Sequence, residues 1–146
     1  MKLNLIKASG NPQSLRTVAT VVARMKKERM VAAMKVGRGL RVAGTFIQRT
    51  SQKEVPVDEG NLKGSAFTRV DGVGFDTKVT VGYEAAYAVF VHENVEMKLK
   101  GQPRAKPSKG RYWDPQGRGK SKFLEDPVKA NRPEILRLVQ TGGMDK

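Results

Sequence analysis

The sequence predicts an α+β fold: a small antiparallel sheet flanked by a long N-terminal helix and a C-terminal helix, with an extended basic loop. Three observations lead to this prediction. An apolar stripe at helical spacing runs through residues 14–50, two short segments of alternating polarity follow a turn-rich stretch, and residues 98–122 combine cations with Gly and Pro. At 146 residues and 38% hydrophobic side chains, the chain suffices for one domain with a lean core.

We therefore expect a single domain over residues 1–146. Its predicted parts are an N-terminal segment 1–13, a long helix 14–50, a loop plus β-hairpin region 51–97, a basic loop or arm 98–122, and a C-terminal helix and tail 123–146.

The first predicted element is the long amphipathic helix. Ser14 is a suitable N-cap, with Pro12 just before it. The apolar positions lie three, four or seven residues apart, at Leu15, Val18, Val22, Met25, Ala32, Val36, Leu40, Ala43 and Ile47. Glycine disfavours a helix interior by about 1 kcal/mol, so we expect a bend or break near Gly37–Gly39. About 35 residues make a helix of about 50 Å, which is longer than this domain needs. We expect its end to lie on a partner.

A hairpin is predicted in the middle of the chain. Residues 51–64 hold breakers and turn formers and indicate a loop. Ser65–Val73 and Thr77–Tyr83 are strand candidates, and Asp71-Gly72 with Gly74 supplies the turn between them. The apolar segment Ala85–Val95 is either a short helix or a buried strand, and its length does not decide between them.

The C-terminal region is predicted to be helical. Asp126-Pro127 is a good helix start, with Pro at the first helical position. Pro133 is expected to kink the helix or to start a second one, and Gly142-Gly143 to end it.

Net charge is +14 and unevenly distributed. Residues 1–50 carry +10 and residues 98–122 carry +8, whereas residues 51–97 carry −4 and residues 123–146 are neutral. Such an excess of cations favours a polyanion or an acidic protein surface as partner. No cysteine is present, which excludes disulfides and thiol chemistry. No apolar run approaches the ~20 residues that span a bilayer, so no membrane partner is expected.

Residues 98–122 supply the candidate interface or DNA-facing side chains. Tyr112 and Trp113 are the expected packing anchors. The expected electrostatic contacts are Lys98, Lys100, Arg104, Lys106, Lys109, Arg111, Arg118, Lys120 and Lys122. The alternative interpretation of residues 98–122 is a loop that only keeps the chain soluble. The alternative for the cations of the first helix is a solvated face without a partner. Without a base-reading motif, these cations would attract nucleic acid independently of its sequence.

No catalytic, metal or cofactor site is predicted. His92 is the single histidine, and no second ligand or triad partner stands at a useful spacing. Gly117-Arg118-Gly119-Lys120-Ser121 ends like a phosphate-binding loop, but Asp114 occupies the position of its first glycine. Asp58 and Glu59 are most simply solvated or capping acids. We expect a protein that is not an enzyme and has no cofactor.

Four segments, in order and spacing, resemble a family of phage proteins. They are Val55-Pro56-Val57-Asp58-Glu59-Gly60-Asn61-Leu62-Lys63-Gly64-Ser65, then Val81-Gly82-Tyr83, then Tyr87-Ala88-Val89-Phe90-Val91-His92-Glu93, and last Lys122-Phe123-Leu124-Glu125-Asp126-Pro127. Over residues 14–140 the chain is similar to the neck and tail-completion (head–tail joining, minor tail component) proteins of long-tailed bacteriophages. Glu59 stands where that family usually has threonine, and Gly64 where it has a polar residue.

The resemblance implies a structural virion protein of the head–tail interface that is assembled in the host cytoplasm. It implies a homo-oligomeric ring, a hexamer or dodecamer, which joins the portal or connector to tail-tube or tail-terminator proteins. Residues 98–122 would order against a neighbour or against packaged DNA. The rival hypothesis is a sequence-nonspecific nucleic-acid-binding protein, whose affinity would fall steeply as salt rises.

Overall fold

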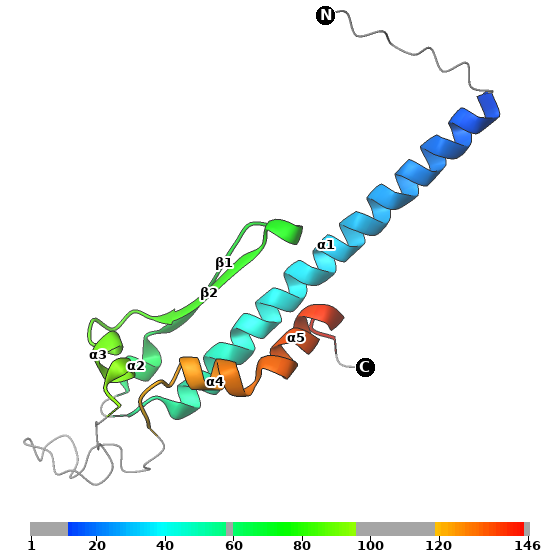
Figure 1. Cartoon of the computed structure of the whole chain (residues 1–146). Coiled ribbons are helices and arrows are strands. Elements are labelled where there is room, and N and C mark those ends of the chain that lie inside the picture. Colours follow the sequence, from blue (N-terminus) through cyan, green and yellow to red (C-terminus); the bar gives the residue numbers. More distant parts are fainter. Residues whose placement is uncertain (1–11, 58–59, 96–118, 145–146) are drawn as a thin grey trace, which may run out of the picture.

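The computed structural model describes residues 12–57, 60–95 and 119–144 of the chain. The predicted α+β class is confirmed: a long N-terminal helix, a two-stranded antiparallel sheet and C-terminal helices (Figure 1). The elements are α1 (Pro12–Glu54), α2 (Asn61–Gly64), β1 (Ala66–Asp71), the 3-10 turn η1 (Gly74–Asp76), β2 (Lys78–Tyr83), α3 (Ala88–Glu93), α4 (Glu125–Ala130) and α5 (Arg132–Thr141).

Helix α1 is the axis of the molecule. The β1–β2 hairpin lies along one side of its C-terminal half, and α4 and α5 lie along another side (Figure 1). Strands β1 and β2 pair from Ala66 opposite Tyr83 to Asp71 opposite Lys78. The alternation predicted for β2 is present, because Val79 and Val81 are half-buried. The hairpin therefore adds a second layer to the helix.

Glycines in α1 allow both neighbours to approach closely, and α1 passes through them as one continuous helix. The expected break near Gly37–Gly39 was wrong, because packing against the neighbouring elements stabilises the helix at these glycines. A methyl group at Gly39 would lie 2.6 Å from the Leu138 carbonyl oxygen of α5. A methyl group at Gly37 would lie 2.8 Å from the Thr77 hydroxyl oxygen, and one at Gly44 would collide with Val79. The loss of helix propensity is offset by the packing that the missing side chains permit.

The ends of α1 differ from the prediction. The helix begins at Pro12, so Ser14 lies inside the first turn and not at the N-cap. It runs to Glu54, and the predicted loop after it contains the single-turn helix α2. Proline suits a first helical position because its missing N–H has no partner there in any case.

The structure decides between the alternatives that the sequence left open for the apolar segment and for Pro133. Residues 88–93 of the apolar segment form the short helix α3 and not a strand. Pro133 lies in the first turn of a second helix, α5, whose C-cap Gly142 has φ 70°, a left-handed value that favours glycine. Helix α4 begins at Glu125, so Pro127 is its third residue and not its first.

The core is small and lies at the C-terminal end of α1. Phe123, Val55, Leu62 and Ala88 are its buried members. The rings of Tyr83 and His92 each meet Phe123 edge-on, with centroids 5.0 Å apart. The hydroxyl groups of Tyr83 and Ser51 are hydrogen-bonded at 2.6 Å, and burial raises the pKa of Tyr83. The chain around Val55 and Leu62, the segment from Tyr83 to His92, and Phe123 itself thus meet in one core.

Candidate assembly surface

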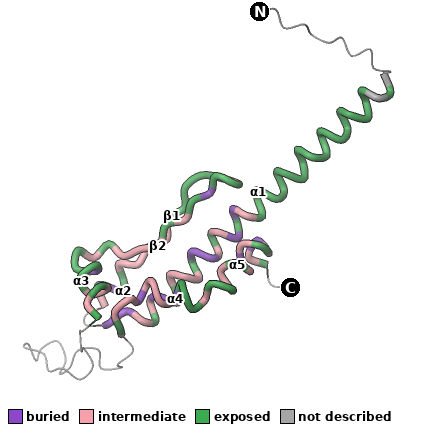
Figure 2. The backbone as a smooth tube through the Cα atoms, viewed as in Figure 1, coloured by how far each residue is buried: buried purple, intermediate pink, exposed green. Residues whose placement is uncertain are grey.

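The N-terminal half of α1 projects from the body with its apolar stripe uncovered (Figures 1 and 2). The side chains of Leu15, Val18, Val22 and Met25 are 56%, 59%, 43% and 64% exposed. Their spacing of three, four and three residues places them on one face of the helix. Full burial of such a side chain from water contributes about 1.5–3 kcal/mol, and each of these four retains about half of its surface to bury, so this face is a candidate for contact with another molecule.

The same stripe is covered further along the helix. Val36, Leu40 and Ile47 are half-buried and Ala43 is buried. On the hairpin side, cover ends where Gly74 of η1 meets Ala33. Residues 15–25 thus continue this face beyond the point where the hairpin and α5 pack against the helix.

The projecting half is also basic. Residues 12–32 hold five cations and one carboxylate. The carboxylate, Glu28, is paired with Arg24 at 2.9 Å, one turn away. Lys26 and Arg29 lie near the apolar stripe, whereas Arg16 and Lys27 lie on the other side of the helix, at about 100° per residue. A partner for this face needs apolar side chains with carboxylates beside them.

The hairpin tip, defined as residues 71–76, has the opposite chemistry. Val73 and Phe75 are 74% and 53% exposed, and Asp71 and Asp76 are exposed at its two ends. Gly72 and Gly74 take positive φ values of 72° and 61°, which turn the chain and leave both apolar side chains outside. The sequence prediction gave this segment to the end of the first strand, which it extended to Val73, and to the turn, and it assigned no surface role to the two apolar residues between acids.

The second basic segment falls largely outside the described residues. Nine of its candidate residues lie there, namely Lys98, Lys100, Arg104, Lys106, Lys109, Arg111, Tyr112, Trp113 and Arg118. Lys120 is described: its ammonium lies 3.1 Å from Glu54, and its N–H donates to the Glu54 carbonyl at 3.0 Å. Gly119 packs against Pro56 without room for a side chain. These contacts attach the start of the C-terminal region to the end of α1, and they use the N–H and ammonium of Lys120 within the chain.

Lys122 is the other described candidate, and it is held by acids of its own chain. Its ammonium pairs with Glu93, and with Glu125 at 3.4 Å. The hydrogen bond to Glu93 raises the pKa of Lys122, and the same bond lowers the pKa of Glu93. Lys122 has φ 54°, in the left-handed region, and its N–H donates to the His92 carbonyl oxygen of α3 at 2.8 Å. Lys122 joins α3 to the C-terminal segment beside Phe123.

His92 has a structural environment. Its Nδ1 lies 2.8 Å from Glu93, and its ring packs on Phe123. Among the described residues, no three His, Cys, Asp or Glu side chains are grouped to hold a metal ion. The prediction that the chain is not an enzyme stays a prediction.

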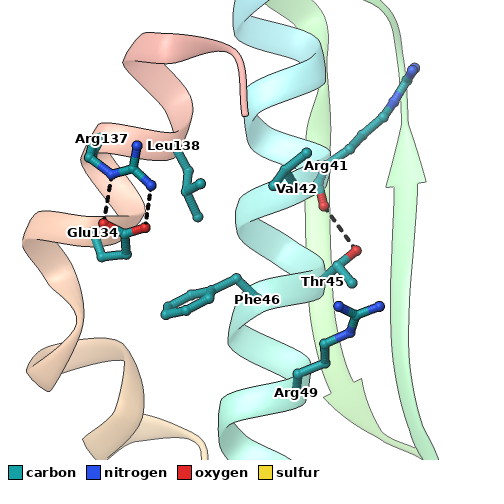
Figure 3. A pocket seen from close by; sticks show the side chains of 8 residues that line it. All are labelled: Arg41, Val42, Thr45, Phe46, Arg49, Glu134, Arg137 and Leu138. Atoms are coloured by element: carbon teal, nitrogen blue, oxygen red, sulfur yellow. Dashed lines mark hydrogen bonds and ion pairs between the residues drawn. The ribbon is translucent and has the colours of Figure 1, made fainter. Parts of the chain in front are cut away.

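A groove of about 450 Å³ lies between α1 and α5 (Figure 3). Glu134 and Arg137 face each other on its α5 side through two hydrogen bonds of 2.6 and 2.8 Å. Phe46 points toward α5, and Arg41 and Arg49 lie on the α1 side. Its one acid is thus already paired with a cation, and no nucleophile with an adjacent base lines it.

No helix in the described ranges combines the length and apolarity needed to cross a bilayer. Comparisons of the chain with protein-family models, with curated proteins and with solved structures find no match.

Proposed function

We propose that this chain is a structural subunit of the head–tail junction of a long-tailed phage. It forms a homo-oligomeric ring between the portal or connector and the tail. The observation that carries the proposal is the projecting half of α1, whose apolar stripe has no partner within the described chain. A subunit that works alone gains nothing from such a face, whereas a subunit of an assembly buries it against a neighbour.

The resemblance in sequence supports the phage assignment within this class. Val55 and Leu62 of the first matching segment, Tyr83 of the second, Ala88 of the third and Phe123 of the fourth all meet in or beside the core. The segments that carry the resemblance are therefore those that set the packing of the body. The basic charge of the chain suits subunit joining and a position beside packaged DNA alike.

A test of this proposal is to locate the protein in particles. We expect a labelled copy to appear at the neck of phage particles in electron micrographs, and the purified chain to form rings alone or on a connector. Particles that contain no copy of the chain would refute the proposal.

The alternative is a sequence-nonspecific nucleic-acid-binding protein, which the five cations on the projecting half of α1 favour. A protein with this alternative function would bind duplex DNA as a monomer or dimer. The logarithm of its association constant would fall linearly with the logarithm of the salt concentration. A DNA-binding titration at several salt concentrations separates the two functions, since the phage subunit is expected to bind weakly throughout. A steep salt dependence without self-association would favour the alternative.

A further inference from the structure

We infer that the projecting half of α1 docks on the hairpin tip of a second copy of this chain. The inference rests on the proposed function only in requiring self-assembly, and it names the two surfaces that meet. One is the stripe of Leu15, Val18, Val22 and Met25 with the adjacent cations, and the other is the tip at residues 71–76.

Continuity along α1 points to a hairpin as the occupant. Within one chain the hairpin packs along one edge of the continuation of this stripe, and α5 packs along the other edge at Gly39. The Thr68 hydroxyl donates to the Gln48 side-chain oxygen at 2.6 Å, and at the other end Gly74 meets Ala33. The intramolecular hairpin reaches no further, and about 30 Å of helix extends beyond it at 1.5 Å per residue. A neighbour's hairpin tip extends the same layer over residues 15–25.

Charge selects the tip among the surfaces of a second copy. Two projecting helices would repel each other, since residues 12–32 of each carry five cations and one carboxylate. The tip offers two exposed apolar side chains, Val73 and Phe75, between two exposed carboxylates, Asp71 and Asp76. Neither carboxylate forms an ion pair with another described residue, so both are open to the cations of an incoming helix. Glu93, Glu125 and Glu134 are already paired within the chain.

The apolar stripe argues for a protein partner over nucleic acid. Phosphate contacts use cations and polar groups, and they leave Val18, Val22 and Met25 in water. A protein surface with its own apolar centre removes these side chains from water and pairs the flanking charges.

The two surfaces differ, so the contact is head-to-tail. Each copy gives its helix to one neighbour and receives a helix from the other, and such an arrangement closes into a ring or continues as a filament. Four stripe residues against a six-residue tip are fewer than the roughly 20–30 residues a side of a standard interface. Ring closure, in which every copy makes two contacts, compensates for the weakness of each.

Charge reversal with exchange of partners tests the inference on the full-length chain. The first variant carries Lys26→Glu and Arg29→Glu beside the stripe, and the second carries Asp71→Lys and Asp76→Lys at the tip. Light scattering after size exclusion measures assembly over a range of protein concentrations. Each variant alone has like charges on both surfaces, so we expect its association to weaken at least about tenfold.

An equal mixture of the two variants restores opposite charges at both contacts, and we expect assembly to recover. Arg16→Glu with Lys27→Glu is the matched control: it makes the same charge change on the other side of the helix and is expected to assemble like the natural chain. Should the tip variant fail to fold by circular dichroism, Phe75→Ser replaces it, with the same expected loss.

The outcomes separate this inference from the proposed function. Rings that survive both reversals overturn the docking contact and leave the proposed function standing. A natural chain that stays monomeric at all concentrations overturns the docking contact, while location in particles decides the proposed function independently. If the reversal of Lys26 and Arg29 abolishes binding of duplex DNA and leaves assembly unchanged, the helix is a nucleic-acid surface and the inference is wrong.

Discussion

At the scale of the residue, Gly39 shows how one missing side chain sets the distance between two helices. A methyl group there would lie 2.6 Å from the Leu138 carbonyl oxygen and 2.7 Å from the Val139 backbone, neither of which can move without shifting α5. Gly64, by contrast, has open space around its position. Substitutions at Gly39 and Gly64 therefore separate the effect of packing at a glycine from the effect of its low helix propensity.

We expect Gly39→Ala to lower the free energy of unfolding by about 1–3 kcal/mol, because overpacking outweighs the gain in helix propensity. Gly64→Ala is the control and should stay within about 1 kcal/mol of the natural chain. Urea unfolding followed by circular dichroism measures both. Equal stabilities for the two variants would show that α5 does not approach α1 as closely as described.

Lys122 supports a prediction on pH. Its hydrogen bond lowers the pKa of Glu93, and Lys129 followed by Lys122 lowers the pKa of Glu125. A carboxylate whose pKa is lower in the folded state stabilises the fold above its ordinary pKa, and this stability is lost as pH falls through the lowered value. The fold should therefore weaken as pH drops from neutral to below the ordinary range of glutamate.

We expect the variant Lys122→Met to lose less stability over that pH range than the natural chain, because Glu93 loses its partner at every pH. Urea unfolding at a series of pH values between 7 and 3 measures this difference. All three groups are partly exposed, so only the direction is predicted. Parallel pH profiles for the two proteins would contradict the role given to Lys122.

At the scale of the element, α1 has two halves with different tasks. The C-terminal half packs between the hairpin and α5, whereas the N-terminal half extends away from both (Figure 1). From its length the sequence predicts that one end of the helix extends beyond the domain, but not which end, because the apolar stripe has the same spacing in both halves. Which half is covered depends on where the hairpin and α5 end, and those lengths follow from contacts distant in sequence.

The same limit applies to the glycines and to the hairpin tip. Local propensity predicts a break at Gly37–Gly39, yet packing against Thr77 and Leu138 keeps the helix whole. Periodicity predicts the strands and the turn, but the exposure of Val73 and Phe75 follows from two positive φ values in the turn. The second basic segment was the predicted site, and its nine residues between Lys98 and Arg118 lie outside the described ranges.

Because only the C-terminal half of α1 is packed, truncating an apolar side chain should change the free energy of unfolding little in the projecting half and strongly in the contact between α1 and α5. Val22→Ala, in the projecting half, should change the free energy of unfolding of the monomer by no more than about 0.5 kcal/mol. Leu138→Ala, in the buried seam between α5 and α1, should cost about 2–5 kcal/mol. Urea unfolding at low protein concentration checks both; a large cost for Val22→Ala would show that its side chain is already buried in the monomer.

In the molecule as a whole, the body provides the stability of the fold, and the projecting helix provides the surface for assembly. The body has a small core around Phe123, and its surface carries the acidic tip. The projecting helix adds apolar surface that only a partner can bury. A chain with this arrangement gains stability from association, because any partner that binds only the folded state shifts folding by mass action.

We therefore expect the thermal midpoint of the natural chain to rise with protein concentration. Arg16→Glu with Lys27→Glu should preserve this rise, whereas Lys26→Glu with Arg29→Glu should remove it, because docking on the tip needs the cations beside the stripe. Differential scanning calorimetry over a hundredfold range of concentration measures the effect. Assembly through another surface would leave the rise in all three proteins. A midpoint that is independent of concentration in the natural chain would mean that the folded body gains no stability from a second copy.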